Sequence, residues 1–176
     1  MKKIKHDWIL KATLISFLIS LFFTSLSEIV LSQLNLVIAF FLLLSIILIG
    51  IMADIIGVAV TAANKRAFNS MAAKKISGSR IAIDLISNAP KVNSIFNDII
   101  GDVCNIISGT IGIIIALTIY NKYGFNLFAA TLLVTSLIAS ITIGGKALGK
   151  EIAIKNNIKI LLHFSKILIV FKKEKL

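Results

Sequence analysis

Four long apolar stretches constrain the fold of this chain more than any other feature of its sequence. They cover residues 8–31, 36–60, 95–120 and 127–143. About 20 apolar residues in a row allow a helix to cross the roughly 30 Å hydrocarbon layer of a bilayer. With 57% hydrophobic and only 15% charged residues, the chain is unlike a soluble domain and still less like a disordered one. We therefore predict an all-α, polytopic membrane protein with about four transmembrane helices.

The first apolar stretch has two interpretations, a retained helix or a cleaved signal peptide. Lys2, Lys3 and Lys5 precede it, as a charged segment precedes the apolar part of a signal peptide. The stretch is long, however, no A-x-A-like cleavage site follows it, and a second span begins almost at once. These features favour a retained helix, which a tight turn at residues 32–35 joins to the second span.

The positive residues predict the orientation of the spans. The chain has 19 Lys and Arg against 8 Asp and Glu, a net charge of +11. With both termini inside, the inner segments are the N-terminus, the 61–94 connection and the tail after residue 145. Counting Lys11 with the N-terminus, they hold every Lys and Arg except Lys122, which is 18 of 19. Because cytoplasmic segments carry such an excess, we predict a multi-pass protein of the plasma or inner membrane with both termini in the cytoplasm.

The 61–94 connection has the pattern of a basic amphipathic segment. We predict a helix over residues 59–76, whose positive residues are Lys65, Arg66, Lys74 and Lys75. Gly78 interrupts this helix, residues 80–87 resume it, and the sequence Asn88-Ala89-Pro90 ends it.

The tail has a similar pattern. Lys155, Lys159, His163 and Lys166 are spaced i, i+4, i+8 and i+11, which places them on one helix face, and apolar residues occupy much of the remaining surface. A helix of this kind lies in the headgroup plane of a membrane and is attracted to anionic lipid.

Four acidic residues lie within the predicted spans, where an ionisable group is costly and therefore a hypothesis of function by default. They are Glu28, Asp54, Asp98 and Asp102. Asp98, Asp102 and Asn105 are spaced i, i+4 and i+7, which places them on one helix face. The glycines of residues 144–149 are expected to break the helix pattern of the last span, and such glycines allow close backbone approach and can free carbonyl oxygens. Oxygen ligands of this kind suit Mg²⁺ or Na⁺, unless these groups pair with one another or mark the membrane interface.

Other chemistries have weaker signals. The single cysteine, Cys104, excludes an intramolecular disulfide. Gly144, Gly149 and Lys150 have the spacing of a phosphate-binding loop, but Glu151 stands where that loop needs Ser or Thr. No Ser or Thr has an evident catalytic base, so we assign no catalytic residue and no cofactor-binding residue. We expect neither an enzyme nor a nucleic-acid-binding protein.

Several motifs, in order, resemble the transmembrane domain of the CNNM/CorC magnesium transporters. In that family a span ends in a pattern such as F-F-S-x-S-E-x-A-L-T-S-L-N-R, and residues 53–65 stand in its place here. A glycine, a basic helix and N-P follow, matched by Gly78-Ser79-Arg80 and by Asn88-Ala89-Pro90. The later motifs G-N-N-x-x-N and G-E-x-x-P-K correspond to residues 101–105 and 145–150.

This resemblance implies an organisation and an ion site. Residues 1–35 would form an added transmembrane helix and hairpin, residues 36–150 the CNNM/CorC-like transmembrane domain, and residues 151–176 the basic surface helix. The resemblance further implies a homodimer, and Mg²⁺ as the transported ion and sole cofactor. Its metal ligands would be Asp54, Asp102, Asn105 and the carbonyl of Gly145. We expect no counterpart of the family's CBS domains, and Lys146 stands where the family has a glutamate.

Two functions follow as expectations. The leading one is a membrane protein of the CNNM/CorC type that transports a divalent cation, with an ion site that is intact, altered or lost. The alternative is a non-transporting membrane scaffold or regulatory subunit, in which an aspartate and Lys146 form an internal ion pair. In both cases the expected partners are the lipid bilayer and anionic lipid headgroups.

Overall fold

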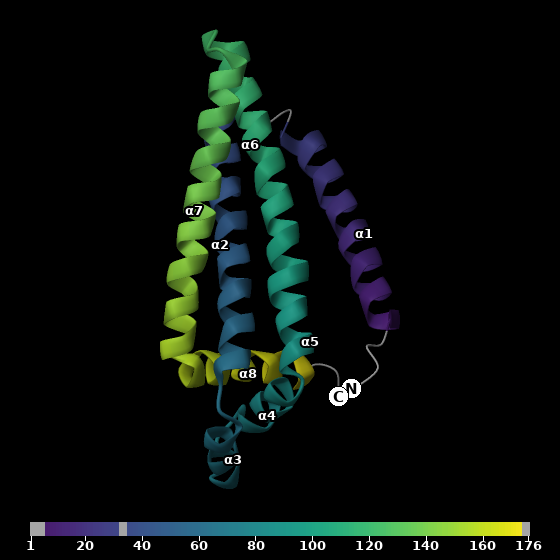
Figure 1. Cartoon of the computed structure of the whole chain (residues 1–176), viewed down its shortest axis with the longest axis vertical. Coiled ribbons are helices and arrows are strands. Elements are labelled where there is room, and N and C mark those ends of the chain that lie inside the picture. The colour runs from purple at the N-terminus through teal and green to yellow at the C-terminus, as the bar shows by residue number, and fades with distance from the viewer. Residues whose placement is uncertain (1–5, 32–34, 174–176) are drawn as a thin grey trace. The chain divides into compact units, whose positions relative to one another are not determined.

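The computed structural model describes residues 6–31 and 35–173, and within these ranges the chain is helical and has no strand. The all-α prediction is thus confirmed for the described part. Lys2, Lys3, Lys5 and residues 32–34 of the predicted turn lie outside it. The elements in Figure 1 are α1 (His6–Leu31), α2 (Leu36–Ala62), α3 (Lys65–Ala73), α4 (Ser79–Ser87), α5 (Ala89–Asn93), the π-helix η1 (Ser94–Gly101), α6 (Asp102–Tyr123), α7 (Leu127–Lys155) and α8 (Asn157–Lys173).

Within the described part of the chain, three helical stretches are long and apolar enough to cross a membrane. They are Leu36–Ala62, the continuous stretch Ala89–Tyr123 formed by α5, η1 and α6, and Leu127–Lys155. Their lengths of 27, 35 and 29 residues exceed the roughly 20 that a span needs. Many of their large apolar side chains are exposed, as on a surface that faces lipid. Helix α1 forms where the first span was predicted, but four spans stay a prediction.

The chain divides into two compact units, and the first comprises residues 1–50 and 101–143. Within it α1 lies beside α6. Gly50 of α2 packs against Cys104 of α6, and Gly112 of α6 packs against Ile138 of α7. Apolar residues spaced i, i+4 and i+8 form the buried faces of the helices in this unit: Ala39, Leu43 and Ile47 on α2, and Ile107, Ile111 and Ile115 on α6.

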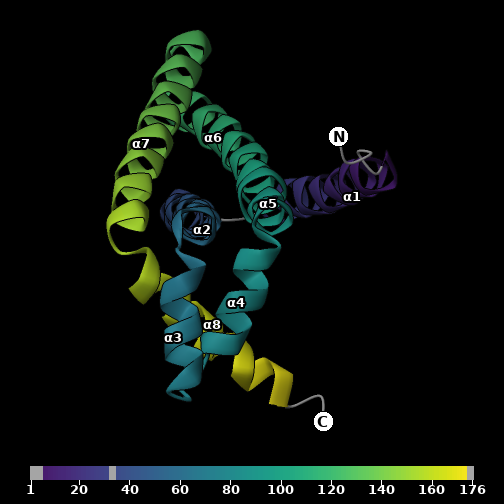
Figure 2. The ribbon, with the colours of Figure 1, turned by 60° about the horizontal axis from the view of Figure 1, so that its bottom comes forward.

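The second unit comprises residues 51–100 and 144–176, and its helices α3, α4 and α8 lie together in Figure 2. Its core joins the end of α2 to these helices and to α5. The buried residues of this core are Val60, Phe68, Ala82, Val92 and Leu161. Phe96 and Phe164 extend it by an edge-to-face contact with ring centroids 5.3 Å apart. This core anchors α8 against the short helices of the connection.

The connection differs in one respect from the predicted single helix over residues 59–76. Helix α2 ends at Ala62, and Asn64 then caps α3 by accepting a hydrogen bond from the backbone N–H of Arg66, with a donor–acceptor distance of 2.9 Å. Asparagine favours such N-cap positions, which explains the break that the sequence pattern missed. The predicted interruption near Gly78 is confirmed. Its φ of +90° is in the left-handed region that favours glycine.

The glycines of residues 144–149 were expected to break the last span, and this expectation is wrong. Helix α7 runs without interruption from Leu127 to Lys155. Since glycine lacks a side chain, these residues can instead serve to bring two helices close together. The predicted tail helix forms as α8, after a short break at Asn156.

Candidate functional site

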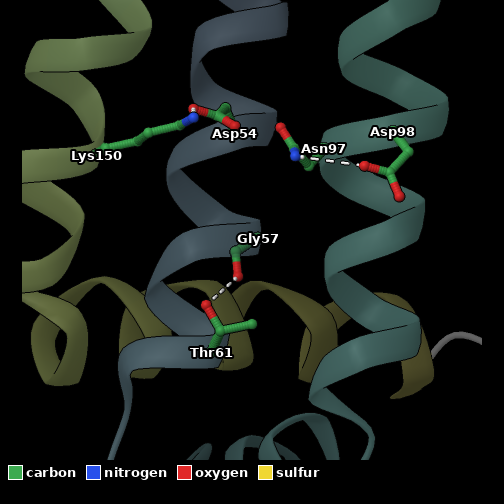
Figure 3. Close-up of polar contacts among 6 residues, drawn as sticks. All are labelled: Asp54, Gly57, Thr61, Asn97, Asp98 and Lys150. Carbon is green, nitrogen blue, oxygen red and sulfur yellow. Dashed lines mark hydrogen bonds and ion pairs between the residues drawn. The ribbon is translucent and has the colours of Figure 1, made fainter.

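Asp54 of α2 is the most unusual polar residue among those described. Its side chain has 0% exposure, and no hydrogen-bond donor among the described residues reaches either carboxylate oxygen. The ammonium group of Lys150 on α7 lies beside it, with Nζ 4.0 Å from Oδ2 (Figure 3). That distance is too long for a hydrogen bond. Burying a carboxylate without hydrogen-bond donors costs about several kcal/mol. Binding of a cation by the carboxylate of Asp54 would offset this cost.

Two pairs of residues set the distance between α2 and α7 at this point. Gly145 and Gly149 are one turn apart on α7 and pack against Ile51 and Ile55, which are one turn apart on α2. A Cβ atom on Gly149 would lie 2.8 Å from Cγ1 of Ile55, and one on Gly145 would overlap Cδ1 of Ile51. The absent side chains therefore let α7 approach α2 closely. Because Lys150 follows Gly149, this contact also brings Lys150 to Asp54.

Amide groups from the third helical stretch face the same part of α2. Asn97 lies in η1, and its Nδ2 donates to Oδ1 of Asp98 over 3.4 Å. This leaves the amide oxygen of Asn97 directed toward α2 in Figure 3. One turn earlier, Oδ1 of Asn93 packs against Gly57, 2.9 Å from where a Cβ atom would stand. Oxygen atoms from two elements thus lie near Asp54 or one turn away from it.

Sequence reasoning missed Asn93 and Asn97. The available signal was their i, i+4 spacing, which places two amides on one side of a helix. The π-helical backbone around Asn97 is a second feature, since such turns within helices occur frequently at functional sites. A π-helix has no simple sequence signature, so only the structure reveals it.

The residues predicted as metal ligands have different surroundings. Asp54 and Gly145 belong to the second unit, whereas Asp102 and Asn105 belong to the first unit and have exposed side chains on α6. Asp98 is likewise exposed. Nothing is described of the side chain of Glu28. In the described part of the chain, no group of three or more His, Cys, Asp or Glu side chains is arranged to hold a metal ion.

The ion pair in the structure differs from the one considered in the sequence. Lys146 is only half-buried, and in the described ranges no ion pair of Lys146 occurs. Lys150, one turn further along α7, pairs with Asp54 instead, and its own side chain is 52% exposed. A neighbouring pair, Lys155 with Glu151, is exposed on both sides and therefore contributes little to stability.

Comparisons with known proteins give no match: no family model, no curated protein and no solved structure is similar to this chain.

Proposed function

We propose that this chain is an integral membrane protein that transports a hard divalent cation, Mg²⁺, in the manner that its resemblance to CNNM/CorC transporters implies. One observation carries the proposal: the carboxylate of Asp54 is fully buried and receives no hydrogen bond from the described residues. Ionisable groups in such positions mark ion pathways. In this proposal α1 is a fourth span, both termini are cytoplasmic, and the protein lies in the plasma or inner membrane.

The proposed site combines one charge with neutral oxygen atoms. Asp54 supplies the charge, and the amides of Asn93 and Asn97 supply oxygen atoms near it or one turn away. Mg²⁺ keeps several of its waters and needs only one or two carboxylates from a protein, so a single buried aspartate suits it. Asp102 and Asn105 are retained as further ligands on the resemblance alone.

Lys150 has a defined role in this proposal. Its ammonium balances the charge of Asp54 when no cation is bound, and it moves aside when a cation enters. A separation of 4.0 Å without a hydrogen bond permits this exchange, and a side chain that is half exposed can extend its ammonium group into water. The lysine would therefore compete with the transported ion rather than bind it.

A flux assay tests the proposal. The full chain is reconstituted into liposomes that contain a Mg²⁺-sensitive dye, and influx is recorded after Mg²⁺ is added outside. Asp54→Asn removes the charge at nearly constant volume and should lower the initial rate by about tenfold or more, because ligand charge sets affinity. Asp84→Asn, the same change at an exposed residue of α4, should leave the rate within about twofold. Equal rates for both variants, or no flux through the parent, would contradict the proposal.

The second candidate function is a non-transporting scaffold or regulatory subunit. The pair of Asp54 with Lys150 favours it, because a permanent ion pair needs no transported ion. In that case Lys150→Met should destabilise the protein by up to about 3–5 kcal/mol, since it leaves a buried charge without a partner. Combining it with Asp54→Asn should restore stability, and added Mg²⁺ should rescue neither variant. Rescue of Lys150→Met by Mg²⁺ would instead support the transporter.

A further inference from the structure

A second polar feature lies away from Asp54, at the turn between α3 and α4. A cavity of about 350 Å³ opens there, and Ile169 of α8 forms part of its wall. Lys75, Ser77 and Arg80 line it from the turn and from the start of α4. The site is therefore built by segments almost a hundred residues apart in sequence, which the core around Phe68 and Leu161 holds together.

All charged residues that line the cavity are positive. Lys75 and Arg80 are exposed at its edge, neither makes an ion pair with any described residue, and no acidic side chain lines the cavity. The wider connection has the same character, since residues 61–94 contain six Lys and Arg against one acid, Asp84. The side chain of Ser77 adds a hydroxyl group. Two cations and a hydroxyl are donors that suit a phosphate group.

The rest of the cavity wall is apolar. Ile76 and Ile81 line it beside Ile169. A ligand that fills this cavity therefore needs both a negative group and hydrocarbon. A soluble anion meets only the first requirement. An anionic phospholipid meets both, and the neighbouring helix α8 has the basic amphipathic pattern of a helix at a membrane surface.

We propose that this cavity binds an anionic phospholipid, with its phosphate diester between Lys75 and Arg80 and the adjoining glycerol and acyl carbons against the three isoleucines. Binding there would attach the turn between α3 and α4, and α8 with it, to the inner leaflet. The site is separate from Asp54 and does not depend on the proposed transport, so each proposal can fail without the other.

The test uses the full chain in a neutral detergent and measures its thermal unfolding while lipid is added to the micelles. Phosphatidylglycerol should raise the Tm in a saturable manner, and phosphatidylcholine should not. The variant Lys75→Gln/Arg80→Gln should need at least about tenfold more phosphatidylglycerol for the same rise, because each cation near an anionic lipid contributes several-fold in affinity. The control Arg66→Gln/Lys74→Gln removes two charges from the same connection but none from the cavity wall, and it should respond as the parent does.

The outcomes separate lipid from other sources of phosphate. Inorganic phosphate and glycerol 3-phosphate, added at the same concentrations, should raise the Tm far less than the lipid. Equal stabilisation by either soluble anion would overturn a lipid site. An unchanged rise in Tm with lipid for Lys75→Gln/Arg80→Gln would also overturn the site. An equal loss of the rise in the control variant would overturn it too, because it would indicate attraction of the lipid to the overall positive charge.

Discussion

Replacing Gly149 by alanine tests whether glycine packing sets the contact between α2 and α7. The added Cβ atom would lie 2.8 Å from Cγ1 and 3.1 Å from Cδ1 of Ile55. Distances below 3.0 Å are not tolerated without movement, and Cγ1 lies close to the backbone, so a change of rotamer alone gives little relief. The backbone of α7 must therefore move away from α2, which also lengthens the distance from Asp54 to Lys150.

The size of the effect follows from two opposing contributions. Alanine is favoured over glycine inside a helix by about 1 kcal/mol, whereas overpacking costs about 1–3 kcal/mol. Gly144 provides the matched control, because it is in the same helix and a Cβ atom there would meet nothing within 4 Å. Gly144→Ala should thus gain about 1 kcal/mol. Gly149→Ala should be less stable than that control by about 1–3 kcal/mol.

Reversible unfolding of the full chain in mixed micelles, followed by circular dichroism, measures this difference. The double variant Gly149→Ala/Ile55→Ala provides a further check, because removing the atoms that clash should recover part of the loss, with a coupling of about 0.5–3 kcal/mol. Equal stability of Gly144→Ala and Gly149→Ala would refute the reasoning. A coupling of zero would show that the loss has another cause.

Two further stability changes can be measured in the same way. Gly78→Ala should cost more than Gly124→Ala by about 1 kcal/mol or more. Both glycines have positive φ, but only the first would place a Cβ atom within 3.2–3.4 Å of α8, at Lys166 and Leu162. If both cost the same, the contact with α8 does not matter. Phe68→Ala should cost about 3–5 kcal/mol, since Phe68 is fully buried, whereas Phe128→Ala, at a side chain that is 78% exposed, should change stability by less than about 0.5 kcal/mol. Similar values for the two would mean that the core around Phe68 is not the one described.

Much of the fold follows from local patterns in the sequence. Long, mostly apolar stretches predict helices of span length because the backbone must satisfy its own hydrogen bonds in lipid. The interruption at Gly78 and the end of α4 before Pro90 also depend on single residues and their backbone preferences. The prediction failed at two places, once because of a helix cap within the segment itself and once because of packing against another helix. Asn64 capped a new helix, and α7 continued through residues 144–149, where Gly145 and Gly149 pack against α2.

The candidate site was harder to predict. The buried acid at Asp54 was identified because a carboxylate in an apolar stretch is conspicuous. The sequence suggested an ion pair of an aspartate with Lys146, without settling which aspartate. The structure pairs Asp54 with Lys150, because which turn of α7 lies opposite Asp54 depends on how Gly149 packs on Ile55. The amides of Asn93 and Asn97 lacked any charge to mark them.

The sequence by itself determined the class of this protein: a helical chain with long apolar helices, basic connecting segments and a few acids where lipid is expected. These properties depend on composition and on short-range periodicity, so they can be recognised from residues that are close together in the sequence. The tertiary structure alone decided which groups meet. It placed Lys150 beside Asp54, turned Asn97 toward α2, and closed a cavity around Lys75 and Arg80 with a residue of α8. The physical reason is that helix contacts arise from the packing of two surfaces, and neither surface is specified by one segment alone.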